Sequence, residues 1–123
     1  MTAGEVISAV DALEPNSFTQ AQKLAMLNGL EGRIFTEVIL THDHNEECEF
    51  TPVASAQSEL IVAGPFAEPV YGRYLQAMIA LQNAEIARYN QQISMFNDAF
   101  RAWSAAHHRI TAPLGPKENR LKF

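Results

Sequence analysis

A stretch of forty residues without proline or glycine, residues 73–112, restricts the possible folds more than any other feature of the sequence. Apolar and aromatic side chains recur in it at intervals of three and four, which is typical of one face of an α-helix. One helix of ~38 residues would be ~57 Å long, whereas a domain of this size is ~25–30 Å across. We therefore expect a helix over 68–108 that either breaks near Asn90 or packs its far half on another subunit. The series is Tyr71, Tyr74, Leu75, Met78, Ile79, Ile86, Tyr89, Ile93, Phe96, Phe100, Trp103 and His107.

Two further helices are expected before this stretch. Thr2 is followed three residues later by Glu5, and Thr19 by Gln22. This is the spacing of a capping box, in which two side chains satisfy free backbone N–H groups at a helix start. Apolar residues at helical spacing follow both boxes, so the sequence predicts helices over 3–13 and 19–42.

The remaining segments lack helical periodicity. Residues 43–58 are acidic and polar and are expected to form a loop, and residues 60–62 a brief strand or a buried extended segment. The tail, 111–123, contains two prolines and a glycine and is expected to be extended. The sequence thus predicts an all-α fold: a small helical bundle with a long C-terminal helix, forming one domain over 1–110, and an extended C-terminal tail.

Composition excludes several classes of protein. The chain of 123 residues carries 14 acidic and 9 basic residues, a net charge of −5. Binding of nucleic acid by neutralising phosphates needs a basic surface, so the acidic balance argues against it. The single cysteine excludes an internal disulfide framework and a four-cysteine zinc site. No apolar run approaches the ~20 residues of a membrane span, and the start lacks the pattern of a signal peptide. We expect a soluble protein in a reducing compartment.

The only group that resembles a metal site is His42, His44 and Cys48. A second pair of ligands is absent nearby, and an acidic, metal-free loop is the simpler interpretation. Cys48 with a histidine is also a conceivable nucleophilic pair, but no glycine-rich oxyanion segment accompanies it. Glu31 and Glu85 are isolated acids on amphipathic helices, expected to be solvated or to cap a helix. The sequence therefore predicts no catalytic residue, no cofactor and no bound metal.

Gly29 and Gly32 lie within the second predicted helix, where each costs ~1 kcal/mol relative to alanine. Their spacing favours close packing or bending of that helix. The alternative is a nucleic-acid-clamping GxxG loop, which the helical periodicity and the lack of basic neighbours disfavour. The aromatic residues of the long helix have two readings as well. They either belong to the core or, around Phe100 and Trp103, form an exposed patch for a partner protein.

Several short runs of residues occur in a fixed order along the chain. They are Val10-Asp11-x-Leu13-x-Pro15-Asn16, Lys23-x-x-x-Leu27-Asn28-x-Leu30-Glu31-Gly32-x-Ile34, Tyr74-Leu75-x-x-Met78-Ile79, Glu85-Ile86-x-x-Tyr89-Asn90 and Phe96-Asn97-x-x-Phe100. In this order they resemble a family of small prophage proteins. Over residues 5–108 the chain is similar to the head–tail connector proteins (adaptor or neck proteins) of tailed bacteriophages.

This resemblance implies a structural protein of the virion, assembled in the host cytoplasm. Subunits of the family form a ring, usually of twelve copies, beneath the portal protein, and give the stopper or tail-completion protein its docking surface. DNA passes through the channel without specific binding, which an acidic lumen favours. The portal-contacting part corresponds to the end of the terminal helix and the tail. The candidate interface residues are Phe100, Trp103, Lys117, Arg120, Leu121, Lys122 and Phe123.

A second class of function stays open at this point. A free helical regulator or protein-interaction module, dimeric through its terminal helix, fits the same composition and periodicity. The composition of the tail favours docking on a partner over packing into the core of its own chain. Lys117, Arg120 and Lys122 lie beside Leu121 and Phe123 on an otherwise acidic chain. We expect its apolar tip to fill a pocket on the portal or on a neighbouring subunit.

Overall fold

The computed structural model describes residues 1–39 and 49–110, with the side chains of all of these except 108–110. Within them the chain is all-α, as predicted, with α1 (Ala3–Leu13), α2 (Gln20–Ile34), α3 (Arg73–Gln82) and α4 (Ile86–Ile110). Shorter helical turns flank them: the π-helical turns η1 (Phe35–Ile39) and η3 (Glu68–Gly72), and the 3₁₀ turn η2 (Gly64–Phe66). The described residues contain no strand.

Both predicted capping boxes are present. The Thr2 hydroxyl accepts a hydrogen bond from the backbone N–H of Glu5, and the Glu5 carboxylate accepts from the N–H of Thr2. Thr19 and Gln22 make the same reciprocal pair at the start of α2. Each pair satisfies two N–H groups that a helix start leaves free. The expected helix over 19–42 is confirmed as far as residue 39, and its last three residues lie outside the described part.

A buried lysine fixes the junction of α1 and α2. The Lys23 ammonium lies 2.7 Å from an Asp11 carboxylate oxygen, and the Asn16 side chain donates to the same oxygen over 3.0 Å. Lys23 is almost fully buried, and a buried ammonium that lost this partner would be strongly destabilising. Three residues of the first two motifs quoted above thus hold the hairpin of α1 and α2.

The segment over 49–63 is the extended, partly buried connection expected around residues 60–62. It pairs with the start of α1 through a single antiparallel bridge between Thr2 and Glu59. The N–H of Gly4 donates to the carbonyl oxygen of Ala56 over 2.8 Å. A Cβ at position 4 would lie 2.9 Å from both the Cβ and the oxygen of Ala56, which explains the glycine there. Leu60 and Val62 point into the core.

The predicted long helix is broken, but not near Asn90. It ends at Gln82 and resumes at Ile86, after a turn in which Ala84 has a φ of 59°. The turn falls where the apolar series has its longest gap, between Ile79 and Ile86, so neither helix loses a core contact by ending there. The break lets α4, ~37 Å long at 25 residues, fold back along α3.

Replacing Ala84 by glycine is expected to stabilise the protein by about 0.5–1 kcal/mol, because a Cβ strains the left-handed conformation. The gain is reduced by the larger backbone entropy of glycine in the unfolded chain. Urea denaturation followed by circular dichroism measures the change. Ala87→Gly, within α4, is the matched control and should destabilise instead.

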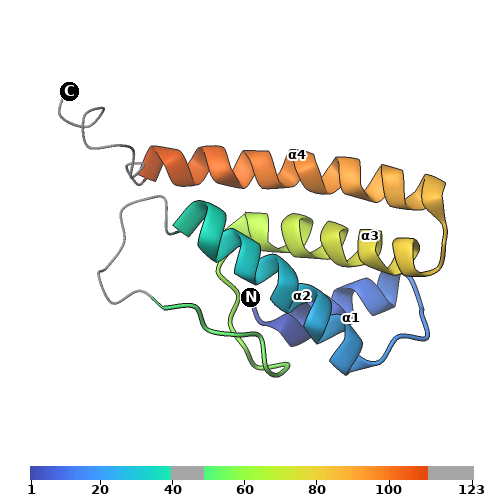
Figure 1. Cartoon of the computed structure of the whole chain (residues 1–123). Coiled ribbons are helices and arrows are strands. Elements are labelled where there is room, and N and C mark those ends of the chain that lie inside the picture. Colours follow the sequence, from blue (N-terminus) through green and yellow to red (C-terminus); the bar gives the residue numbers. More distant parts are fainter. Residues whose placement is uncertain (40–48, 111–123) are drawn as a thin grey trace.

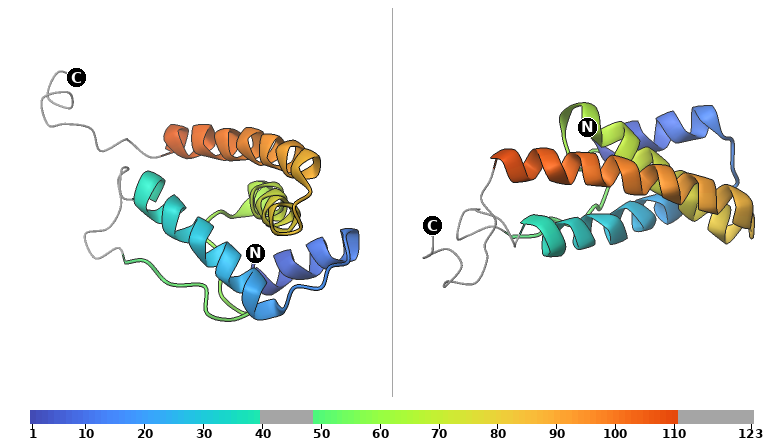
Figure 2. Two further views of the ribbon diagram at one scale, coloured as in Figure 1. Left: turned by 45° about the vertical axis from the view of Figure 1, so that its right-hand side comes forward. Right: turned by 90° about the horizontal axis from the view of Figure 1, so that it is seen from above.

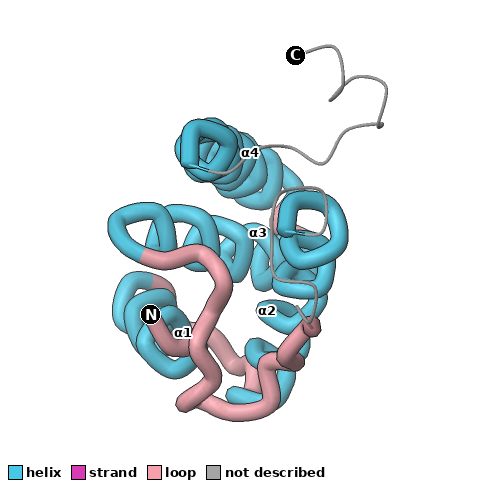
Figure 3. The backbone as a smooth tube through the Cα atoms, turned by 90° about the vertical axis from the view of Figure 1, so that its left-hand side faces the viewer, coloured by secondary structure: helices cyan, strands magenta, loops and turns pink. Residues whose placement is uncertain are grey.

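Helix α3 lies in the middle of the bundle. Figure 1 shows α4 along one side of α3, with α2 and α1 on the other side, and the left view of Figure 2 agrees. The principal contacts of α4 are with α3, η3 and η2. Figure 3 shows the loop segment over 49–63 on the side of the bundle opposite α4. The core joins all four α-helices; its largest fully buried side chains include Tyr71, Leu27, Leu30, Ile34, Leu75, Ile79 and Glu31.

Candidate functional site

The aromatic series on α4 turns inward. Successive rings pack against one another from Tyr74 of α3 to Phe96, Phe100, Trp103 and His107, with centroids 5.3–5.8 Å apart; the first three pairs are tilted or edge-on, and Trp103 and His107 are stacked. Trp103 is 7% exposed and belongs to the core, whereas Phe100 is half-buried at its edge. Trp103 is therefore a core residue. Of the predicted interface residues that the structure describes, Phe100 is the one that a partner can reach. The other predicted interface residues, 117–123, lie outside the described part of the chain.

Replacing Trp103 by alanine is expected to lower the free energy of unfolding by about 3 kcal/mol, the usual cost of removing a large buried aromatic ring. Its ring packs between those of Phe100 and His107, so the C-terminal half of α4 should fray first. Hydrogen exchange of residues 99–107 and denaturant unfolding measure this. Retained stability would show that Trp103 serves a partner and not the core.

The outer face of α4 forms the first candidate interface. The exposed residues of this face are small, amide-bearing or apolar, with few charges: Ile86, Ala87, Asn90, Gln91, Ser94, Met95, Asn97, Ala102 and Ala105, beside Arg88, Asp98 and Arg101. Ile86 is 56% exposed, and Leu81 and Met95 are also exposed. A helix covered on one side is the usual arrangement at a protein surface; what distinguishes this face is its low charge and the exposed Ile86 and Met95, which a partner chain could cover.

A buried carboxyl group lies on the other side of the bundle. Glu31, on α2, is 1% exposed, which contradicts its expected role as a solvated acid. The hydroxyl of the buried Tyr71 donates to Glu31 Oε1, and the backbone N–H of Ile61 donates to Oε2 over 2.9 Å. The N–H of Val62 in turn donates to the Tyr71 hydroxyl over 2.9 Å. This cluster ties the extended segment to α2 and η3.

The sequence carried a signal for this burial. Leu27, Glu31, Ile34 and Val38 follow each other at intervals of four, three and four, so Glu31 occupies a core position of the helical stripe. Burial of an acid at such a position requires donors, because an unpaired buried carboxylate is costly. The donors come from residues 30 to 40 positions away, which no local pattern reveals.

Burial raises the pKa of Glu31, and the hydrogen bonds from Tyr71 and Ile61 counteract part of that rise. Burial also raises the pKa of Tyr71, and the neighbouring Glu31 charge raises it further. The phenol therefore stays protonated and remains a donor to the carboxylate at any physiological pH.

A pH dependence of stability follows from the raised pKa of Glu31. A carboxyl whose pKa is higher in the folded than in the unfolded chain stabilises the fold while it is protonated. That contribution is present below the ordinary value of 4.5 and is lost as the pH rises through the folded-state pKa. We expect the stability of the native chain, relative to Glu31→Gln, to fall over this interval. Urea titrations from pH 4 upwards, a range chosen from the ordinary glutamate pKa of ~4.3, measure it. A difference that does not change with pH would contradict the raised pKa.

A pocket of about 240 Å³ opens beside this cluster, between η1 and the extended segment. We call it the acidic pocket; it is lined by Glu31, Phe35, Ile39, Glu49, Thr51, Glu59, Leu60 and Ile61. Both oxygens of Glu31 are engaged, whereas Glu49 and Glu59 are exposed. Apolar walls with carboxylates at the rim suit a ligand that is both apolar and basic.

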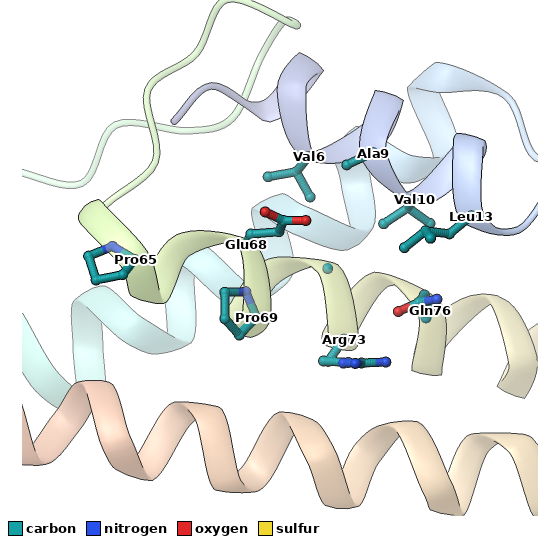
Figure 4. A pocket seen from close by; sticks show the side chains of 10 residues that line it. Val6, Ala9, Val10, Leu13, Pro65, Glu68, Pro69, Arg73 and Gln76 are labelled. Atoms are coloured by element: carbon teal, nitrogen blue, oxygen red, sulfur yellow. The ribbon is translucent and has the colours of Figure 1, made fainter.

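A second groove, of about 290 Å³, runs between α1 and the segment from Pro65 to Gln76. Figure 4 shows Val6, Val10 and Leu13 on its α1 side. Arg73 points away from α1, towards α4, where it donates to the Gln92 side chain over 3.2 Å. Leu13 is 72% exposed. The groove is mixed: apolar side chains of α1 form one side, and Glu68, Arg73 and Gln76 are the polar residues on the other.

Residues 1–39 and 49–110 contain no further group of side chains with the arrangement of a metal or catalytic site. No three or more histidine, cysteine or acidic residues there are placed to hold a metal ion. His42, His44 and Cys48 lie outside the described residues. Gly29 and Gly32 lie within the continuous helix α2, not in a loop. Glu85 is exposed and pairs with Arg88. No helix of this part has the length and apolar character to cross a membrane.

Comparison with models of protein families, with curated proteins and with solved structures finds no match for this chain. The arguments for function therefore rest on the residues and their arrangement.

Proposed function

We propose that this chain is a head–tail connector subunit of a tailed bacteriophage, which docks on the portal protein, forms a ring and extends the DNA channel. Its partners are the portal, further copies of itself and the stopper or tail-completion protein. The observation that carries the proposal is the outer face of α4, a helix of 25 residues whose principal contacts all lie on one side. The motifs that resemble those of connector proteins are the reason for assigning this surface to contacts with the portal and with neighbouring subunits.

The charge distribution supports a ring. Residues 1–85 contain three basic and twelve acidic residues, a net charge of −9, whereas residues 86–123 contain six basic and two acidic residues, a net charge of +4. Two copies therefore attract each other when the C-terminal part of one meets the N-terminal part of the next. Such head-to-tail contacts generate a ring where the rotation closes, whereas a symmetric dimer through residues 86–123 would bring two net positive segments together. The dimeric regulator is accordingly the weaker candidate.

The test is assembly with the portal. The full chain is mixed with the portal protein encoded in the same genome, and the products are examined by native mass spectrometry and negative-stain electron microscopy. We expect a portal bearing an added ring of subunits. Absence of binding, with a chain that remains a monomer or a dimer at all concentrations, would refute the proposal.

A matched pair of variants tests the surface itself. Ala102→Glu places a charge on the outer face of α4, and Ala25→Glu places the same charge on the exposed face of α2. We expect only the first to reduce ring formation, with both retaining the helical circular-dichroism spectrum. Equal assembly by both variants would remove α4 from the interface.

A further inference from the structure

The acidic pocket has the chemistry of a receptor for a basic peptide with an apolar tip. Phe35, Ile39 and Leu60 form apolar walls, and Glu49 and Glu59 lie at the rim. Its volume of about 240 Å³ exceeds the ~150 Å³ of an engineered apolar cavity that takes up benzene. The pocket therefore has room for one aromatic side chain. Glu49 at the rim is placed to meet a cation beside it, whereas Glu59 already pairs with the N-terminal ammonium of Met1 over 3.3 Å.

The C-terminal segment of this chain has the matching chemistry. Residues 117–123 carry Lys117, Arg120 and Lys122, with Leu121 and Phe123 among them and a single acid, Glu118. Six of the nine basic residues of the chain lie after residue 85, and this segment holds three of them. The tail and the acidic pocket of this chain therefore carry opposite charges, so a second copy of the chain can serve as the partner.

From these features we infer that the acidic pocket receives residues 117–123 of a second copy of the chain, with Phe123 or Leu121 between its apolar walls. The inference rests on the proposed function in one respect: it supplies the contact between neighbouring subunits of the ring. The pocket is lined by η1 and by residues 49–61, and Figure 1 shows the end of α2 at the same end of the bundle as the last turns of α4, from which the chain continues into the tail. Each copy then offers one tail and one pocket, and both are used once in a closed ring.

Glu31 and the π-helical turn η1 hold the two walls of the acidic pocket in place. The turn η1 supplies Phe35 and Ile39, and the ring of Phe35 lies 5.7 Å from that of Phe50, at the start of the extended segment. The bond from Ile61 to Glu31 holds the opposite wall. Because both walls are fixed in the free subunit, the cost of ordering on binding falls mainly on the tail.

Photo-cross-linking locates the tail directly. Phe123→p-benzoylphenylalanine is introduced into the full chain, unlabelled and ¹⁵N-labelled subunits are mixed in equal amounts, and the products of irradiation are mapped by mass spectrometry. We expect cross-links to peptides that contain 35–39, 49–51 or 59–61, about half of them joining one labelled and one unlabelled chain. Cross-links only within chains of one label would place the tail in its own pocket. That result, cross-links elsewhere, or none would overturn the inference.

A charge exchange provides an independent measurement. Glu49→Lys and Lys122→Glu should each weaken self-association several-fold in analytical ultracentrifugation, and the double variant should restore it. Glu68→Lys, on η3 outside the acidic pocket, is the control that should leave association unchanged. Failure of the double variant to recover would also refute the pairing.

These experiments separate the two proposals. Cross-links between copies in a chain that binds no portal would uphold the pocket and refute the connector assignment. A portal-bound ring in which position 123 cross-links only to the portal would uphold the connector and refute the pocket.

Discussion

Replacing Glu31 by alanine is expected to lower the free energy of unfolding by about 3–5 kcal/mol, because it leaves two buried donors unpaired and a cavity in the core. The donors are the Tyr71 hydroxyl and the N–H of Ile61. Loss of the bond from Ile61 loosens the wall of the acidic pocket around residues 59–61, while the N–H of Val53 still donates to Asn28 of α2 over 2.8 Å. Guanidinium unfolding of the two proteins measures the difference.

Two control variants define what the loss means. Glu68→Ala removes an exposed carboxylate and should change stability by less than about 0.5 kcal/mol. Tyr71→Phe keeps the ring and removes only the hydroxyl, which strands the N–H of Val62 and should cost about 2 kcal/mol. If Glu31→Ala behaved like Glu68→Ala, the buried cluster would contribute nothing to the fold.

Deleting residues 112–123 is expected to abolish assembly while leaving the helical circular-dichroism signal and the melting temperature nearly unchanged. Residues 1–39 and 49–110 already contain a core that joins all four α-helices, so the deletion removes no part of it. The deletion does remove Lys117, Arg120 and Lys122 together with Leu121 and Phe123. Light scattering and electron microscopy with and without the portal measure the loss.

The control for this deletion keeps the length of the tail. A chain in which residues 112–123 are replaced by twelve glycine and serine residues should also fail to assemble, which assigns the effect to side chains and not to length. Complete connector–portal complexes formed by the truncated protein would reduce the tail to a solvated terminus.

The helices could be predicted because their signals are local. A capping box spans four residues, and the apolar spacing of α1 and α2 follows directly from one helical face. The position of the break in the long helix was misplaced because polar residues around Asn90 suit a turn as well as those around Asn83. Tertiary packing decides between them, since the turn over 83–85 keeps Phe96 and Trp103 against the core.

The candidate sites were harder to predict, since they depend on contacts between distant segments. Trp103 was named as a candidate interface residue, with the core as the alternative, and it is buried in the core. The outer face of α4 emerges only once α4 is seen to pack on one side. Glu31 was expected to be solvated or to cap a helix because a lone acid is usually exposed. The two π-helical turns had no signal in the sequence, yet one supplies Phe35 and Ile39 to one wall of the acidic pocket and the other carries Tyr71.

The antiparallel arrangement of α4 on α3 has a mechanical consequence. The turn over 83–85 joins α4 to the bundle at one end, and the tail continues from the other end. Tension on the tail directed along the helix axis, away from that turn, loads the ring contacts from Phe96 to Trp103 simultaneously, in shear. Tension directed outward from the bundle instead peels α4 off one turn at a time, starting at Trp103. The same helix is thus a strong attachment in one direction of pull and a weak one in the other.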